Sequence, residues 1–254
     1  MNGNLGERRI YNSINGQRVF LLDYKRGDVT GDGVPDNVYL YGNKPGGPSS
    51  PFADNITLVI QDGRYNQAKA VAPRCTAGYH AQLFLGDFDQ DLTCDIQVSL
   101  EAGGSGGYIY STVYSYKKQI LRELFDSEAY NSHFQYAVDY HDFYRVSVTS
   151  GQYNRLFFLD ISGSVSDGAN NPYGPDGRLL RPTSGSVLPL GALTPIANSE
   201  TGDYFDLLAA QRIIGLTNAD TLGTVENLLT WDGQRFALKA MTVSIPGVPL
   251  TNNV

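Results

Sequence analysis

A nine-residue acidic loop occurs twice in this chain, at residues 28–36 and 87–95. Oxygen-bearing side chains occupy positions 1, 3, 5 and 9 of each copy: Asp28, Thr30, Asp32 and Asp36 in the first, and Asp87, Asp89, Asp91 and Asp95 in the second. Carboxylates this close repel one another unless a cation neutralises them, and a hard divalent ion takes roughly six to eight oxygen ligands. Calcium suits a flexible all-oxygen loop better than magnesium, which requires a stricter octahedron. The repeated loop therefore predicts two calcium sites.

The residues around each loop exclude an EF-hand, which needs a glutamate at position 12 and a helix on each side. Position 12 is Tyr39 in the first loop and Val98 in the second. After the second loop, Ile96, Val98 and Leu100 alternate with polar residues, which is the period of a half-buried strand. We therefore expect each loop to join two β-strands. A pair of acidic hairpin turns without metal is the simpler alternative, because such turns are common.

The strand–loop–strand unit resembles the FG-GAP/VCBS repeat of integrin-α-type β-propellers and of many bacterial surface proteins. The resemblance is closer at residues 28–36 than at residues 87–95, where Leu92 replaces the usual glycine. That glycine often takes a positive φ, so Leu92 predicts either local strain or an altered loop shape. The resemblance implies that the backbone carbonyls of Val34 and Thr93 complete the two ligand sets. The whole chain also resembles FG-GAP/VCBS-type proteins of spore-forming Bacillales that have no established activity.

The two loops start 59 residues apart, at positions 28 and 87, close to the length of a four-stranded propeller blade (about 40–50 residues in common families). A degenerate third copy at residues 198–206 inverts the Asp-Gly order to Gly202-Asp203, which breaks the register of the donors. A third calcium near Asn198–Asp206 is therefore a weaker prediction.

Hairpin signals between the loops, such as Asp62-Gly63 and Asp232-Gly233, divide the chain into four groups of three to four strands. Asn15-Gly16 predicts a further hairpin, whose first strand at residues 9–14 would complete the last blade. We predict an all-β fold, a single β-propeller domain of about four blades over residues 1–254. A five-bladed or incomplete propeller is the alternative.

Residues 162–195 interrupt the strand pattern with a sequence rich in glycine, serine and proline. We expect a long loop insertion here, and loops of this length usually carry function or are disordered. Residues 209–214 would suit a helix, but their position after the third loop favours a strand.

Composition limits the function classes. Twenty aspartates against six glutamates favour turns and metal loops over helices. A net charge of −7 without any basic run argues against nucleic-acid binding. No apolar segment approaches the roughly 20 residues of a membrane span, and we expect neither membrane insertion nor a signal peptide in this chain.

The chain has 17 tyrosines, and strand alternation places Tyr108, Tyr110, Tyr114 and Tyr116 on one face. Packing inside a sheet explains most of them, and a contact surface for a sugar or another subunit is the alternative. The two cysteines, Cys75 and Cys94, could pair in an oxidising compartment, and the sequence leaves this open.

No set of residues predicts catalysis. Ser105 lies in a G-x-S-x-G match, but that motif forms a nucleophile elbow only between a strand and a helix, and strand signals lie on both sides here. The leading hypothesis is a non-catalytic, calcium-stabilised structural or interaction module of a bacterial cell or spore surface, such as a spore coat. Its partners would be other surface proteins or further copies of itself. A carbohydrate-binding, lectin-like propeller comes second, and a polysaccharide-processing enzyme third.

Overall fold

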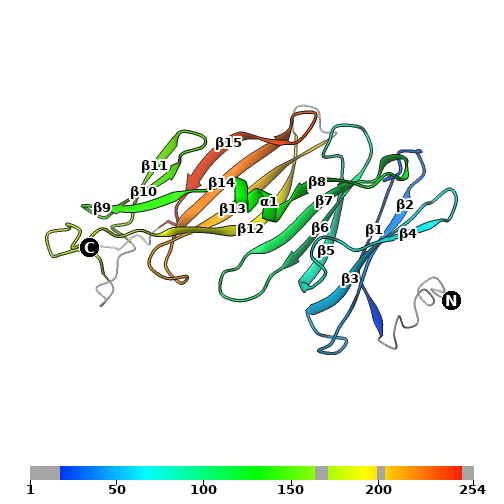
Figure 1. The fold of residues 1–254 in the computed structure, drawn as a ribbon, viewed down its shortest axis with the longest axis horizontal. Coiled ribbons are helices and arrows are strands. Elements are labelled where there is room, and N and C mark those ends of the chain that lie inside the picture. Colours follow the sequence, from blue (N-terminus) through cyan, green and yellow to red (C-terminus); the bar gives the residue numbers. More distant parts are fainter. Residues whose placement is uncertain (1–17, 164–170, 199–203, 248–254) are drawn as a thin grey trace, which may run out of the picture. The chain divides into compact units, whose positions relative to one another are not determined.

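The computed structural model describes residues 18–163, 171–198 and 204–247 (Figure 1). These residues form fifteen strands, one 3₁₀ turn and one short helix. In chain order they are β1 (Val19–Gly27), β2 (Asp36–Asn43), β3 (Phe52–Gln61), β4 (Ala68–Val71), β5 (Gly78–Gly86), β6 (Asp95–Glu101), β7 (Ile109–Ser115), η1 (Lys117–Gln119), β8 (Arg122–Asp126), α1 (Ser127–His133), β9 (Ala137–His141), β10 (Arg145–Ser150), β11 (Arg155–Asp160), β12 (Ser186–Ala197), β13 (Phe205–Ile214), β14 (Thr221–Trp231) and β15 (Phe236–Ser244).

The strands follow one another as meanders, in which neighbours in the chain are also neighbours in a sheet. Four such groups are present: β1–β4, β5–β8, β9–β11 and β12–β15. Two short β3–β5 pairings, Phe52 with Tyr79 and Ala53 with Gly78, join the first two groups into one eight-stranded sheet. The all-β prediction is therefore confirmed.

The three sheets of the described residues are open, and no propeller is shown. The strand at residues 9–14 that was predicted to complete the last blade lies outside the described residues, together with the Asn15-Gly16 turn.

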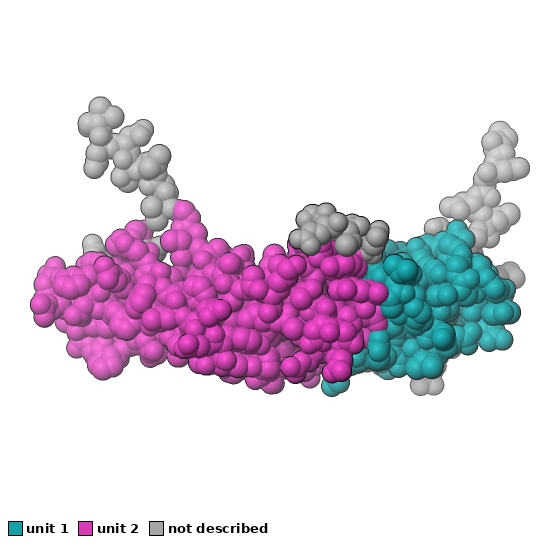
Figure 2. All heavy atoms as spheres, turned by 90° about the horizontal axis from the view of Figure 1, so that it is seen from above, with its two compact units in different colours: residues 1–87, 91–102, 112–123 teal, residues 88–90, 103–111, 124–254 magenta. Residues whose placement is uncertain are grey.

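The chain divides into two compact units (Figure 2). Unit 1 comprises residues 1–87, 91–102 and 112–123, and unit 2 comprises residues 88–90, 103–111 and 124–254. The strands β7 and β8 contribute residues to both. The single domain over residues 1–254 stays a prediction.

In the core of unit 1, buried residues recur at every second position along the strands. In β2, buried residues alternate strictly with half-buried ones, and Val38 and Leu40 are completely buried. The strand β6 differs from the half-buried prediction, because Gln97 and Ser99 are buried as well as its apolar residues. Their side chains are hydrogen-bonded to each other at 3.2 Å, which offsets the cost of removing these polar groups from water. Both faces of β6 are therefore covered.

The core of unit 2 lies between two sheets. Buried residues of β9–β11, including Val146, Val148 and Leu159, pack in one apolar cluster with Ile213 and Val225 of β13 and β14. Two facing sheets of this kind bury one side of each meander.

Three local predictions have different outcomes. Residues 209–214 form part of β13, as predicted. The long loop predicted at residues 162–195 ends earlier, because residues 186–195 belong to β12, whose proline and glycine obscure its strand character in the sequence. The helix α1 was missed; Asp126 caps it by accepting a 2.9 Å hydrogen bond from the amide of Ala129.

Half of the predicted tyrosine face is buried. Tyr114 and Tyr116 are buried, and Tyr108 and Tyr110 are half-buried. Packing in the sheet therefore accounts for half of this set.

Candidate metal centre

Each acidic loop joins two β-strands, as predicted, and in the structure these are the first two strands of a meander. Residues 28–35 connect β1 to β2, and residues 87–94 connect β5 to β6. The aspartate at position 9, Asp36 or Asp95, is the first residue of the following strand, and both are 0% exposed.

Position 1 organises the turn in the same way in both loops. The carboxylate of Asp28 accepts hydrogen bonds from the amides of positions 5 and 6 at 3.2 and 2.8 Å. The carboxylate of Asp87 accepts the corresponding two bonds at the same lengths. The two loops are therefore structural as well as sequence repeats.

The backbone conformation is repeated too. Positions 4 and 6 have positive φ in both loops, through Gly31 and Gly33 in the first and Gln90 and Leu92 in the second. Leu92 has φ 65° and its side chain is 85% exposed. Of the two outcomes predicted for Leu92, the structure shows the unchanged loop shape with a left-handed, strained leucine.

Position 5 is paired with a basic side chain in both loops. Arg64 Nε lies 2.8 Å from Asp32 Oδ2, and Arg64 Nη2 donates to the Asp32 carbonyl at 2.7 Å. Lys117 makes the same two contacts with Asp91, at 3.1 Å to the carboxylate and 2.8 Å to the carbonyl. Arg64 lies between β3 and β4, and Lys117 lies between β7 and β8, so each basic side chain comes from the connection between the third and fourth strands of its meander. Asp32 and Asp91, both predicted metal ligands, are therefore already neutralised by the protein.

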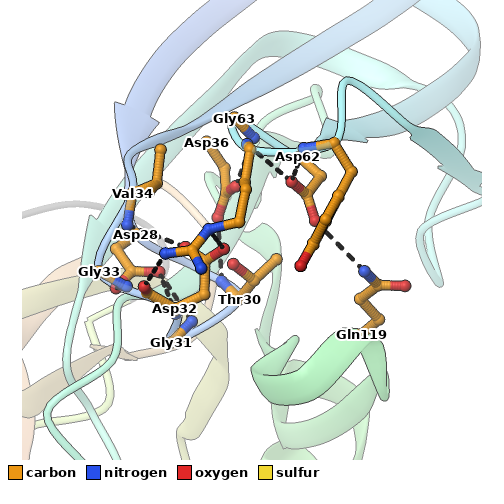
Figure 3. Close-up of polar contacts among 12 residues, drawn as sticks. Asp28, Thr30, Gly31, Asp32, Gly33, Val34, Asp36, Asp62, Gly63 and Gln119 are labelled. Carbon is orange, nitrogen blue, oxygen red and sulfur yellow. Dashed lines mark hydrogen bonds and ion pairs between the residues drawn. The ribbon is translucent and has the colours of Figure 1, made fainter.

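At position 9, Asp36 is held by backbone amides (Figure 3). Its Oδ2 accepts from Val29 and Thr30 at 2.9 and 3.0 Å, and its Oδ1 accepts from Gly63 at 2.9 Å. Three hydrogen bonds leave about one of the four lone-pair positions of a carboxylate open. Within the described residues, the buried hydroxyl of Thr30 makes no hydrogen bond.

The second loop brings three carboxylates together. Asp87, Asp89 and Asp95, at positions 1, 3 and 9, are buried, and one oxygen of each lies within 4.8 Å of the other two. In the described part of the chain this is the one such group of three, and the first loop lacks it because position 3 is Thr30. We call these three residues the carboxylate trio.

The pKa of Cys94, which lies in the second loop, reflects the negative charge of the nearby aspartates. Burial raises the pKa of the Cys94 thiol, and the charges of Asp28, Asp95 and Asp87 raise it further. Cys94 is a free thiol, and so is Cys75.

Val34 and Thr93, whose carbonyls were predicted as ligands, are each held by the aspartate at position 5 of their loop. The amide of Val34 donates to Asp32 Oδ1 at 2.8 Å, and the amide of Thr93 donates to Asp91 Oδ1 at 3.0 Å. Coordination by their carbonyls stays a prediction.

The third loop connects β12 to β13, again the first two strands of a meander. Residues 199–203 lie outside the described residues. Asp206 is buried, and its Oδ2 lies 3.3 Å from Lys239 Nζ and 3.5 Å from Asn198 Nδ2. A lysine therefore neutralises the last acidic position of this loop.

Two other features have a clear structural context. Ser105 lies in the connection between β6 and β7, so the G-x-S-x-G match stands between two strands and not at a nucleophile elbow. Among the described residues, no helix has the length and apolar character needed to cross a bilayer.

Comparison with known proteins corrects the family expected from the loops. The family model of the YybI C-terminal domain matches residues 134–244. The chain is 43% identical to the uncharacterised protein YybI of Bacillus subtilis (strain 168) over 226 residues, which is 89% of this chain and 85% of the relative. No solved structure gives a significant match.

The predicted FG-GAP/VCBS membership is therefore wrong. Its physical basis was a local turn. Aspartate side chains accept backbone hydrogen bonds and glycines adopt positive φ in the same kind of turn in unrelated proteins. The chain belongs to the YybI family.

Proposed function

We propose that this chain is a non-catalytic structural or interaction module of a bacterial cell or spore surface, stabilised by calcium. The carboxylate trio carries this proposal, because three buried carboxylates with oxygens within 4.8 Å repel strongly unless a cation lies among them. Calcium accepts irregular all-oxygen loops, whereas magnesium favours a regular octahedron and retains its waters.

The two loops differ in the charge that they offer a cation. The second supplies three carboxylates, Asp87, Asp89 and Asp95. The first supplies Asp28 and Asp36 with the hydroxyl of Thr30, so we propose a second, weaker site there. Lys239 already neutralises Asp206, which argues against a third site.

The low ligand charge of the first loop also supports a surface location. Calcium loops with few carboxylates have dissociation constants of about 10⁻⁴–10⁻³ M, a range that suits extracellular modules. Other surface proteins or further copies of this chain are the partners proposed there.

The four meanders support the finer fold proposal, a propeller of about four blades. In each of them the strand order follows the chain, as in a propeller blade. Small-angle X-ray scattering tests the ring, because a row of unclosed meanders would give a more elongated particle than a closed propeller.

Calorimetric titration with calcium tests the metal proposal. Asp89→Asn removes a trio carboxylate and should weaken binding to the second loop. Asp91→Asn should weaken it less, because Asp91 is paired with Lys117. Asp176→Asn, in a carboxylate that is 66% exposed and far along the chain, is the matched control. The proposal fails if the unmutated chain releases no heat with calcium, or if Asp89→Asn binds as the control does.

Carbohydrate binding is a second candidate, favoured by a row of tyrosines on β1 and β2. Tyr24 is paired with Tyr39 across the strands, with ring centroids 5.0 Å apart, and Tyr41 follows at 5.7 Å from Tyr39. The amides of Asn37 and Gln61 lie beside the row, bonded to the hydroxyls of Tyr24 and Tyr39. Aromatic faces bordered by amides can stack on a sugar and bond its hydroxyls.

A glycan array probed with and without EDTA tests this candidate. We expect binding that is lost in Tyr39→Ala and kept in Tyr65→Ala, whose ring is exposed but outside the row. Equal signals from both variants would exclude the row as the binding surface.

A further inference from the structure

We propose that a pocket beside α1 binds a small aromatic carboxylate. The pocket has a volume of about 470 Å³ and lies within unit 2, between the end of β8, α1 and the β14–β15 hairpin. This volume falls in the range of about 300–1,000 Å³ that is typical of small-molecule sites. The pocket contains no residue of the carboxylate trio, so the proposal is independent of calcium.

Stacked aromatic rings form one wall of the pocket. The ring of Phe134 lies between Tyr130, at 4.5 Å, and Tyr153, at 5.3 Å with an interplanar angle of 13°. Phe125 and Phe236 also line the pocket and meet edge to face at 6.0 Å. Aromatic rings prefer such offset-stacked and edge-to-face partners, so a flat ring is the group that this wall suits best.

Three polar side chains converge at the pocket. His133 Nε2 and the Tyr153 hydroxyl are 3.0 Å apart. Burial raises the pKa of Tyr153, and the positive charge of Arg235 acts in the opposite direction, which is consistent with a guanidinium close to that hydroxyl. An aromatic wall with a few convergent polar groups is the usual composition of a ligand pocket.

Arg235 is available for an anion. Its side chain is 79% exposed, and its ion pair with Asp232 is long, at 3.8 Å from Nε to Oδ2. The guanidinium fork matches a carboxylate through two parallel hydrogen bonds.

The acidic neighbours limit the charge of the ligand. Asp126 also lines the pocket, where its carboxylate caps α1, and Asp232 lies next to Arg235. One cation near two carboxylates favours a singly charged carboxylate over a doubly charged phosphate.

The chain contains a reporter for occupancy. Trp231 is its single tryptophan, and its ring lies 5.3 Å from that of Phe236, edge to face. A ligand that contacts Phe236 should therefore change the tryptophan fluorescence.

The test uses 4-fluorophenylacetate and its neutral analogue 4-fluorophenylacetamide, followed by fluorine NMR line broadening and by Trp231 fluorescence. We expect the acid to bind about tenfold more tightly than the amide, as for one charge-assisted hydrogen-bonded pair. Arg235→Gln should reduce the affinity for the acid about tenfold and leave the amide unchanged. Arg155→Gln, in an exposed arginine of β11, should change neither.

Arg235→Lys retains the charge without the fork and should give an intermediate affinity; circular dichroism shows that each variant is folded. The proposal is overturned if neither probe binds, if acid and amide bind equally to the unmutated chain, or if Arg235→Gln binds the acid normally.

Discussion

Leu92→Gly should make the protein more stable, although it removes a large side chain. Leu92 occupies position 6 of the second loop with φ 65°, where the first loop has Gly33 with φ 81°. A left-handed conformation costs a residue with a Cβ about 1–2 kcal/mol. The leucine gains little from packing in return, because its side chain is 85% exposed.

The net effect follows from two opposing terms. Glycine removes the strain but increases the conformational entropy of the unfolded chain, which costs about 0.4–1 kcal/mol. We therefore expect a gain of about 0.5–1 kcal/mol, or about 1–4 °C in melting temperature for a chain of this size. The reverse change, Gly33→Ala, should destabilise by about 0.5–1 kcal/mol after the same entropy term is subtracted. Its new Cβ would have no atom within 4 Å, so the cost comes from φ alone.

Chemical denaturation in EDTA measures these changes without a contribution from metal. Leu92→Ala is the matched control, because it keeps the Cβ and its strain while removing the rest of the side chain; we expect it within about 0.5 kcal/mol of the unmutated chain. If Leu92→Gly is no more stable than Leu92→Ala, or if Gly33→Ala is neutral, the strain argument is wrong.

Two further predictions concern solution conditions. Calcium at a hundredfold excess over its dissociation constant should add about 2.7 kcal/mol and raise the melting temperature by about 5–10 °C relative to EDTA; a shift of equal size in Asp89→Asn would contradict binding at the trio. Burial raises the pKa values of Tyr136 and Tyr173 to about 12, so their contribution to stability is complete below pH 10 and is lost as the pH rises from 10 towards 12. Absorbance at the tyrosinate band and circular dichroism should change together there, and ionisation of all tyrosines near pH 10 in a still-folded chain would refute the assignment.

The loops were predictable from the sequence because their chemistry is local. The hydrogen bonds of Asp28 and Asp87 stay within five residues, and turn residues such as Gly33 mark the backbone conformation directly. The hairpins at Asp62-Gly63 and Asp232-Gly233 were predictable for the same reason.

The partners of position 5 were not predictable, because they are distant in the chain. Arg64 is 32 residues from Asp32, and Lys117 is 26 residues from Asp91. No spacing rule links such pairs, so the sequence assigned both aspartates to a metal. Burial of Gln97 also depends on what covers the second face of β6, which alternation alone does not show.

The bond between Asp36 and Gly63 has a consequence for how the chain folds. It connects the β1–β2 loop to the β3–β4 turn, and the two bonded residues are only 27 positions apart in the chain. Contacts that are close in sequence need little loop closure, so such a meander can form quickly and without the rest of the chain. We therefore expect folding during synthesis to proceed one meander at a time.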